Sequence, residues 1–223
     1  MKLRSLIVLG MVLLFGTVAF GQDYAKVEVP MYYSFMRFNP ENSNIVSGFS
    51  MNGGGGGVTV YLSHAVGITA DFNGYASTHQ TFHFPATANS PCPAGCTAVG
   101  SGDMFTYEVG PTFKYRGEKW EPFVEALFGG AHSNTYNTLF HDICVNPGTC
   151  TTTHTPSNNA FDFVIGGGLD IPVSHHFSIR PAQFDFVLTR FGNDFTKGNQ
   201  NQSNFRYNEG AVFQHVQEAA NGA

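Results

Sequence analysis

The sequence has few charged residues and, beyond its first twenty or so positions, no long apolar run. Asp, Glu, Lys and Arg make up 12% of the 223 residues, whereas an ordinary soluble domain contains about 25%. A helical membrane protein is excluded, because each of its spans needs about 20 mostly apolar residues. The formal net charge of -5 makes nucleic acid a poor candidate partner, since the phosphate backbone attracts basic proteins.

Phenylalanine and glycine, by contrast, are abundant. The chain holds 22 Phe and 26 Gly, and aromatic residues reach 14%. Its apolar residues alternate with polar or small ones along several stretches. Successive side chains of a strand point to opposite faces, so this alternation predicts strands with one apolar face. The combination is typical of a transmembrane β-barrel.

The first 21 residues have the pattern of a secretory signal peptide. Lys2 and Arg4 are basic, residues 6–18 are apolar, and residues 19–21 include small residues at the cleavage positions. The alternative, an N-terminal membrane helix, would need a longer apolar run. We therefore expect export, a barrel over residues 22–215 and a short tail over 216–223. Without Lys2 and Arg4 the mature chain has a formal net charge of -7.

The stretch 160–191 carries the clearest pattern. Phe161, Phe163 and Ile165 share one face and Asp162 and Gly166 the other, and a second strand follows a turn at 172–175. Strands of soluble sheets average about 5–6 residues, so two strands of about twice that length favour a membrane crossing.

Eight strands emerge when the chain is taken in order. Besides the 160–191 hairpin they cover 26–38, a segment that follows the glycine run 53–57, then 66–73, 104–115, 120–130 and 204–214. Short turns at 63–65, 116–119 and 172–175 alternate with long connections at 39–52, 75–103, 131–159 and 192–203. The sequence thus predicts an all-β fold: an eight-stranded antiparallel up-and-down transmembrane β-barrel with short periplasmic turns and long extracellular loops.

Two positions break the alternation. The apolar parity changes between Ile179 and Phe184, which predicts a β-bulge at 180–183 beside Pro181. Strict alternation also places Glu209 among lipid-facing residues, and the sequence leaves open whether its side chain faces lipid or the lumen.

The polar faces carry charged residues that we expect to form an ion network inside the barrel. They are Glu108, Glu125, Asp170, Arg180, Asp185 and Arg206. An eight-stranded barrel is filled by its side chains, and buried charges are costly unless they are paired. We therefore expect Arg180 and Arg206 to bridge several carboxylates and to plug the barrel. A narrow porin-like channel gated by the same residues is the alternative.

The four cysteines lie in two of the long connections. Cys92 and Cys96, and Cys144 and Cys150, each close a small loop, and in an oxidising exported context two local disulfides are expected. The alternative is a zinc site made by His141, Cys144, Cys150 and His154.

The sequence does not indicate an enzyme or a cofactor. His132 and Ser133 are adjacent in a predicted strand and point to opposite faces, so they do not form a nucleophile–base pair. The glycine run 53–57 lacks the Lys-Ser/Thr of a phosphate loop and precedes a strand. We expect these glycines to let the strand pack against bulky interior side chains.

A secreted lipocalin-like barrel is the alternative to a membrane protein. It would turn the apolar faces inward around a ligand. Aromatic residues near the strand ends favour the membrane, since they suit interfacial girdles. They are Tyr33, Phe35, Tyr107, Tyr115, Trp120, Phe191, Phe205 and Tyr207.

The mature chain as a whole resembles the small eight-stranded outer-membrane barrels of the OmpA-like transmembrane, or outer membrane protein β-barrel, type. The resemblance rests on the segments 107–111 (YEVGP), 122–124 (PFV), 166–170 (GGGLD), 179–183 (IRPAQ) and 204–207 (NFRY) with Gly210. It implies a bacterial outer-membrane protein whose expected partners are membrane lipids, the barrel-assembly machinery and an unidentified extracellular ligand of the loops. We expect a monomer with a structural or surface-exposed interaction role.

Overall fold

The computed structural model describes residues 24–39, 48–84, 96–133, 159–190, 192–193, 198–199 and 201–216. Among these residues no helix is long and apolar enough to cross a membrane. The predicted signal peptide and nearly all of the predicted tail lie outside the described residues.

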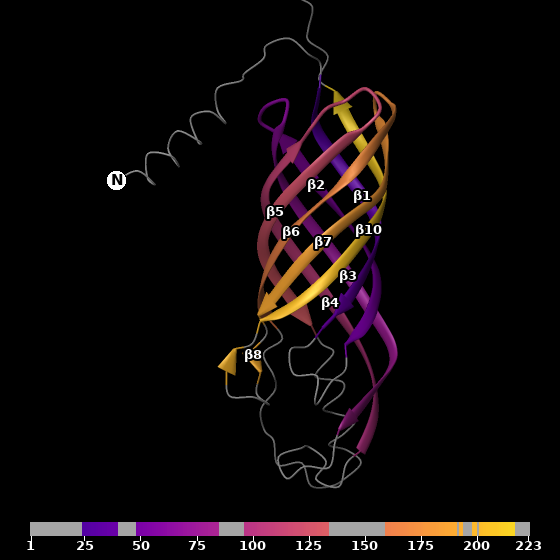
Figure 1. Ribbon diagram of the computed structural model, residues 1–223, viewed down its shortest axis with the longest axis vertical. Coiled ribbons are helices and arrows are strands. Elements are labelled where there is room, and N and C mark those ends of the chain that lie inside the picture. The colour runs from indigo at the N-terminus through magenta and orange to yellow at the C-terminus, as the bar shows by residue number, and fades with distance from the viewer. Residues whose placement is uncertain are drawn as a thin grey trace, which may run out of the picture.

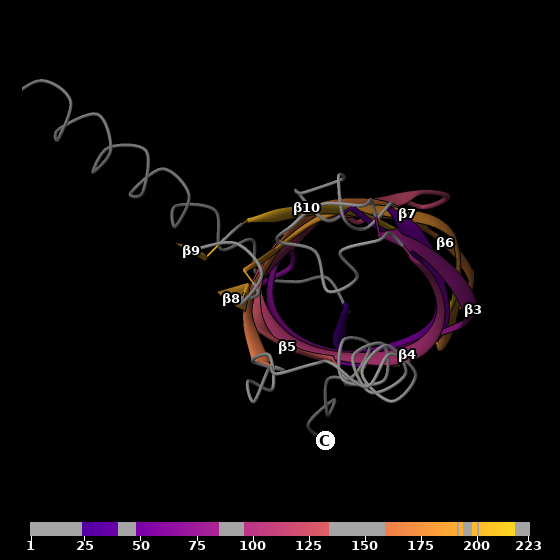
Figure 2. The same cartoon turned by 90° about the horizontal axis from the view of Figure 1, so that it is seen from below.

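Eight long strands form a closed barrel (Figures 1 and 2). They are β1 (Ala25–Phe38), β2 (Phe49–Tyr61), β3 (Val66–Phe84), β4 (Cys96–Lys114), β5 (Glu121–Ser133), β6 (Asn159–Ser174), β7 (Phe177–Arg190) and β10 (Gln202–Val216). Each pairs antiparallel with its neighbours, and β1 pairs with β10 to close the wall. Two short strands, β8 (Gly192–Asn193) and β9 (Gly198–Asn199), pair separately. The predicted eight-stranded up-and-down barrel is confirmed.

The two ends of the barrel differ. Ala25 pairs with Val216, so the first and last strands begin and finish at the end where residues 62–65, 115–120 and 175–176 make short connections. We call this the turn end. The connections 39–48, 85–95, 134–158 and 191–201 leave the opposite end, which we call the loop end.

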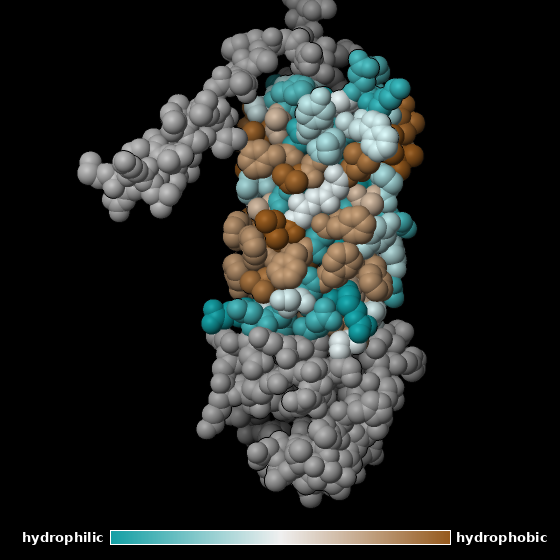
Figure 3. All heavy atoms as spheres, in the orientation of Figure 1, coloured by the Kyte–Doolittle hydropathy of each residue, from teal (hydrophilic) through white to brown (hydrophobic). Residues whose placement is uncertain are grey.

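The wall is apolar outside and mostly polar inside. Figure 3 shows apolar side chains over the visible face, bordered by polar residues toward the loop end. Large apolar side chains from all eight strands are exposed, among them Val29, Val60, Phe72, Val109, Phe128, Ile165, Phe184 and Phe213. This orientation is the reverse of the one that the lipocalin-like alternative requires.

The interior near the loop end contains a cluster of apolar side chains that the sequence did not predict. The buried cluster there comprises Met36, Phe38, Phe49, Met51, Tyr75, Met104, Leu127, Ala131, Ala160, Val164 and Val187. Phe49 and Met51 belong to β2, so the prediction of a loop over 39–52 was wrong in its last residues. The apolar residues of this segment point inward. The strand was therefore not predicted from the pattern of outward-facing apolar residues.

The connection predicted over 75–103 is mostly strand. β3 continues to Phe84 and β4 begins at Cys96, and the two pair along this length with one register shift between Ser77 and Gln80. Residues 80–84 pair with 96–100, whereas β2 and β5 pair with these strands only at levels nearer the turn end. The hairpin therefore projects beyond the wall (Figure 1). Its Ser, Thr and Gly content led to the prediction of a loop where the structure has paired strands.

The bulge predicted at 180–183 is confirmed. Leu169 and Ile171 of β6 pair with Ala182 and Ile179, so β7 contains one extra residue between them. The pairing with β10 shifts at the same place. As a result Arg180 and Gln183, three residues apart, are both buried inside the barrel.

Glu209 faces outward and is exposed. The Tyr207 hydroxyl donates to its carboxylate (2.9 Å) and lies 3.1 Å from the carbonyl oxygen of Pro181 in the bulge. The bulge does not turn Glu209 inward, because the extra residue belongs to β7 and β10 keeps its alternation.

The glycine run 53–57 lies within β2, and its Gly55 packs against an interior aromatic ring. A Cβ atom at Gly55 would lie 2.7 Å from a ring carbon of Tyr32, whereas one at Gly74 in the adjacent strand would meet no atom within 4 Å. The expectation that a glycine here accommodates a bulky interior side chain is confirmed at this position.

We predict that Gly55→Ala destabilises the barrel by about 1–3 kcal/mol, the usual range for overpacking. Gly74→Ala is the matched control, and it should leave the free energy of unfolding unchanged or raise it by about 0.5–1 kcal/mol. Urea unfolding from lipid vesicles measures both. Equal effects of the two substitutions would contradict the packing assigned to Gly55.

Candidate functional site

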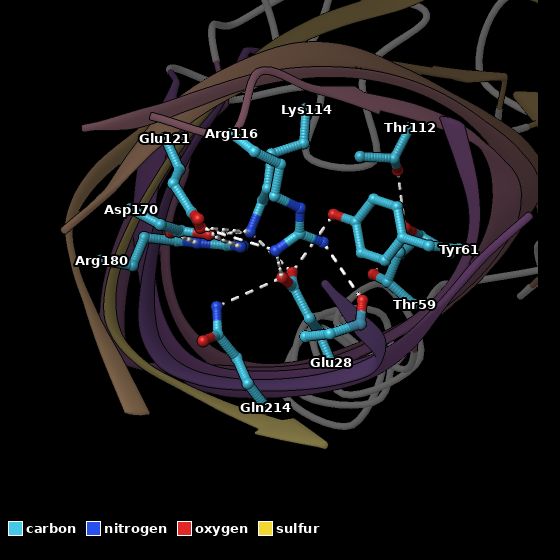
Figure 4. Close-up of polar contacts among 12 residues, drawn as sticks. Glu28, Thr59, Tyr61, Thr112, Lys114, Arg116, Glu121, Asp170, Arg180 and Gln214 are labelled. Carbon is cyan, nitrogen blue, oxygen red and sulfur yellow. Dashed lines mark hydrogen bonds and ion pairs between the residues drawn. The ribbon is translucent and has the colours of Figure 1, made fainter. Parts of the chain in front are cut away.

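The charged interior of the barrel is the candidate site, and Lys114 is the centre of its turn-end part (Figure 4). Its Nζ atom lies 2.6 Å from Glu28 Oε2 and 2.7 Å from Asp170 Oδ2. The three residues come from β4, β1 and β6, none of which are neighbours in the sheet. These ion pairs therefore cross the lumen, and they join parts of the wall that share no backbone hydrogen bonds.

Arg116 adds a second cation at the same level. Its Nη1 atom lies 2.8 Å from Glu28 Oε1, and its guanidinium lies 4.4 Å from the centre of the Tyr61 ring. Glu121 Oε2 lies 3.6 Å from Lys114 Nζ and 3.7 Å from Arg116 Nη1. The carboxylates of this cluster thus each face at least one cation, as buried charges require.

Arg180 links the turn-end cluster to the middle of the barrel. It donates from Nε and Nη2 to the two oxygens of Asp170, at 2.7 and 3.0 Å, a two-point contact that fixes both side chains. Its Nη1 donates to Gln183 Oε1 (2.9 Å), and Gln183 Nε2 donates to Glu125 (2.8 Å) and to Asp185 (3.0 Å). Because the bulge of β7 turns both Arg180 and Gln183 inward, it makes this link possible.

Arg206 is the cation at the mid-level of the barrel, and it is completely buried. Its Nε donates to Asp185 Oδ2 at 2.7 Å, and its Nη1 donates to Glu108 Oε1 at 3.4 Å. Its Nη2 lies 3.7 Å from Asp71 Oδ2. Asp71 also accepts a hydrogen bond from the Tyr32 hydroxyl. One guanidinium thus serves three carboxylates from three different strands.

Little space remains among these groups. A cavity of about 10 Å³ lies between the two levels and is bordered by Tyr32, Thr59, Lys114, Arg180 and other interior residues. That volume holds about one water molecule. Toward the loop end the apolar cluster of Met36, Phe38 and their neighbours follows.

The structure places all six residues of the predicted network inside the barrel. Glu108, Glu125, Asp170, Arg180, Asp185 and Arg206 are each at most 6% exposed. Sequence reasoning missed six further charged residues that face inward: Glu28, Asp71, Lys114, Arg116, Glu121 and Asp162. Most of them alternate in step with a charged residue nearby in the chain that was predicted to face inward. This alternation could have revealed them.

The remaining predictions on site residues concern the loops. Cys92, Cys144 and Cys150, with His141 and His154, lie outside the described residues, and Cys96 begins β4. His132 is exposed on the outer face and Ser133 is buried on the inner one, as predicted from their adjacency. Among the described residues no group of three or more His, Cys, Asp or Glu side chains is arranged to hold a metal ion.

No protein-family model matches the sequence, and no curated protein matches it. Solved structures do match. The outer membrane protein OprG of Pseudomonas aeruginosa has a TM-score of 0.56 at 9% identity, with 88% of this chain and 99% of that chain covered. Neisserial surface protein A (NspA) has a TM-score of 0.54 at 6% identity, with 86% and 98% covered.

The chain has the fold of the small eight-stranded outer-membrane barrels. The resemblance inferred from the sequence is thereby confirmed for the fold. At these identities the likeness carries no information about ligands or partners.

We predict that Arg180→Gln lowers the free energy of unfolding by about 3 kcal/mol and produces no ion current in planar bilayers. The loss follows because Asp170 and Gln183 lose a buried partner, and removing one member of a buried pair costs about 3–5 kcal/mol. The exposed Arg37 supplies the control, Arg37→Gln. A gain of discrete conductance with unchanged stability would instead identify a gate.

Proposed function

We propose that this protein is an integral outer-membrane barrel with a closed interior that presents its loop-end connections at the cell surface. The observation that carries this proposal is the pairing of an apolar outer wall with a buried, ion-paired lumen. In water the wall would expose a continuous apolar surface far larger than soluble monomers carry. In a bilayer the same apolar wall contacts the hydrocarbon chains of the lipids.

The orientation follows from the lengths of the connections. Bacterial outer-membrane barrels have short turns on the periplasmic side and longer loops outside. We assign the turn end to the periplasm, where the chain would arrive after signal-peptide-dependent export. Tyr115 and Trp120 are 70% and 60% exposed at this end, and their amphipathic rings suit a membrane–water interface.

The closed lumen argues for a role other than transport. A solute would have to displace the loop-end apolar cluster, the Arg206 level and the Lys114 level in turn. The second and third of these barriers consist of charges that lose their partners when separated, at a cost of several kcal/mol each. We therefore favour a structural or interaction role over a porin-like channel.

The β3–β4 hairpin is the part of the described chain best placed to contact an external partner. Residues 80–84 and 96–100 pair only with each other beyond the wall. The neighbouring strands of the wall hold the base of this two-stranded projection. We propose that its partner is an extracellular ligand. We propose as well that the protein is a monomer, with membrane lipids and the barrel-assembly machinery as its other partners.

An epitope inserted after residue 90, in the connection between β3 and β4, should bind antibody on intact cells. The same epitope inserted after Glu118, in the 115–120 turn, should bind only after the outer membrane is permeabilised. Flow cytometry with and without permeabilisation measures both, and heat-modifiable gel migration confirms that each variant has folded. Labelling in the reverse order would overturn the assigned orientation, and a folded protein that stays soluble without detergent would overturn the membrane assignment.

A further inference from the structure

The charges inside the barrel do not balance. Eight buried carboxylates face inward among the described residues: Glu28, Asp71, Glu108, Glu121, Glu125, Asp162, Asp170 and Asp185. The inward cations are Lys114, Arg116, Arg180 and Arg206. The other described Lys and Arg side chains are exposed. Four acidic groups are therefore in excess in a medium where an uncompensated charge is costly.

The excess is concentrated at the mid-level. Lys114 and Arg116 face Glu28, Glu121 and Asp170 at the turn end, and Arg180 is held by Asp170. Arg206 is then the cation left for the carboxylates farther along the barrel, and it contacts Asp71, Glu108 and Asp185. No ion pair within the described residues reaches Asp162.

Asp162 and Glu108 meet across a glycine. Glu108 of β4 is paired with Gly129 of β5, and Gly129 is paired with Asp162 of β6. Strands lie about 4.8 Å apart, so the backbones of the two residues are on the order of 10 Å apart, and the residue between them has no side chain. They are close enough for their side chains to interact directly.

Several oxygens at this point have no hydrogen-bond partner. Both carboxylate oxygens of Asp162, which is 0% exposed, are unpartnered, as is Glu108 Oε2. Thr106 lies two residues before Glu108 on the same inward face, and its hydroxyl oxygen is likewise buried and unpartnered. Asp162 and Glu108 thus leave three buried oxygen atoms unpartnered where the negative excess is greatest, and Thr106 adds a fourth on the same inward face of β4.

We propose that these oxygens bind one hard divalent cation, Mg²⁺ or Ca²⁺, inside the barrel. Both ions take oxygen ligands, and Mg²⁺ is commonly held by one or two carboxylates with water completing its shell. The site needs only two carboxylates and a hydroxyl, so it differs from a cage of three or more acidic or His/Cys ligands. A divalent ion would satisfy the unpartnered oxygens and remove half of the charge excess.

The test compares the full chain with Asp162→Asn and Glu108→Gln, each refolded into lipid vesicles with EDTA, with Mg²⁺ or with Ca²⁺. Urea unfolding, read by circular dichroism and by heat-modifiable migration, gives the stability, and equilibrium dialysis against ⁴⁵Ca²⁺ counts bound ions. Glu118→Gln, at an exposed turn residue, is the control. Both neutralised variants remove excess charge, so they should fold.

The expected result is one bound ion per chain and an unfolding equilibrium shifted about 100-fold toward the folded state when the cation is at 100 times its Kd. Asp162→Asn and Glu108→Gln should abolish both effects, and Glu118→Gln should keep them. A wild-type stability that is the same in EDTA and in either cation would overturn the proposal. It would indicate that the two carboxyl groups share a proton and bind no cation. Binding that survives in both variants would also overturn it, because the ion would then lie elsewhere.

Discussion

Charges buried inside a membrane barrel must be paired with opposite charges across the lumen. Lys114 satisfies this constraint by meeting Glu28 and Asp170 from strands that are not its neighbours. The number of strands and their hydrogen-bonded stagger set the diameter of the barrel. The ion pairs fill the interior and join strands that share no backbone hydrogen bonds.

The bulge in β7 follows from the same constraint. Regular alternation would turn either Arg180 or Gln183 toward the apolar outer face, where an unpaired polar group is costly. One extra residue lets both face the lumen, and they then connect Asp170 to Glu125 and Asp185. On the outer face the Tyr207 hydroxyl lies 3.1 Å from the Pro181 carbonyl oxygen. A local irregularity of the strand thus joins the two charged levels of the interior.

Much of this fold can be predicted from the sequence because a barrel in a bilayer obeys two simple rules. Apolar and polar residues alternate along each strand, and short turns alternate with long loops between the strands. Alternation of apolar and polar residues identified the eight strands, and a parity change located the bulge near Pro181. The ends of the strands were harder, since both rules weaken outside the bilayer. The β3–β4 projection extends beyond the neighbouring strands, and the apolar side chains of Phe49 and Met51 point inward.

The interior network could be predicted only in part, for a different reason. Parity shows which side chains point inward, and it found Arg180 and Arg206. Which carboxylate each cation meets depends on the stagger of the strands around the barrel, and this is why Lys114 was not identified as the partner of Glu28. The position of Glu108 relative to Asp162 depends likewise on two pairings, that of β4 with β5 and that of β5 with β6, which both involve Gly129. The sequence does not specify the register of either pairing.

A double-mutant cycle on Glu28 and Lys114 measures how much their ion pair stabilises the barrel. Glu28→Gln, Lys114→Met and the double variant are unfolded by urea from lipid vesicles. If the cross-lumen pair holds the wall, the two substitutions should be coupled by about 1–3 kcal/mol. The same cycle on the exposed turn residues Glu118 and Lys119 should give no more than about 0.5 kcal/mol. Additivity at Glu28 and Lys114 within that margin would contradict the account.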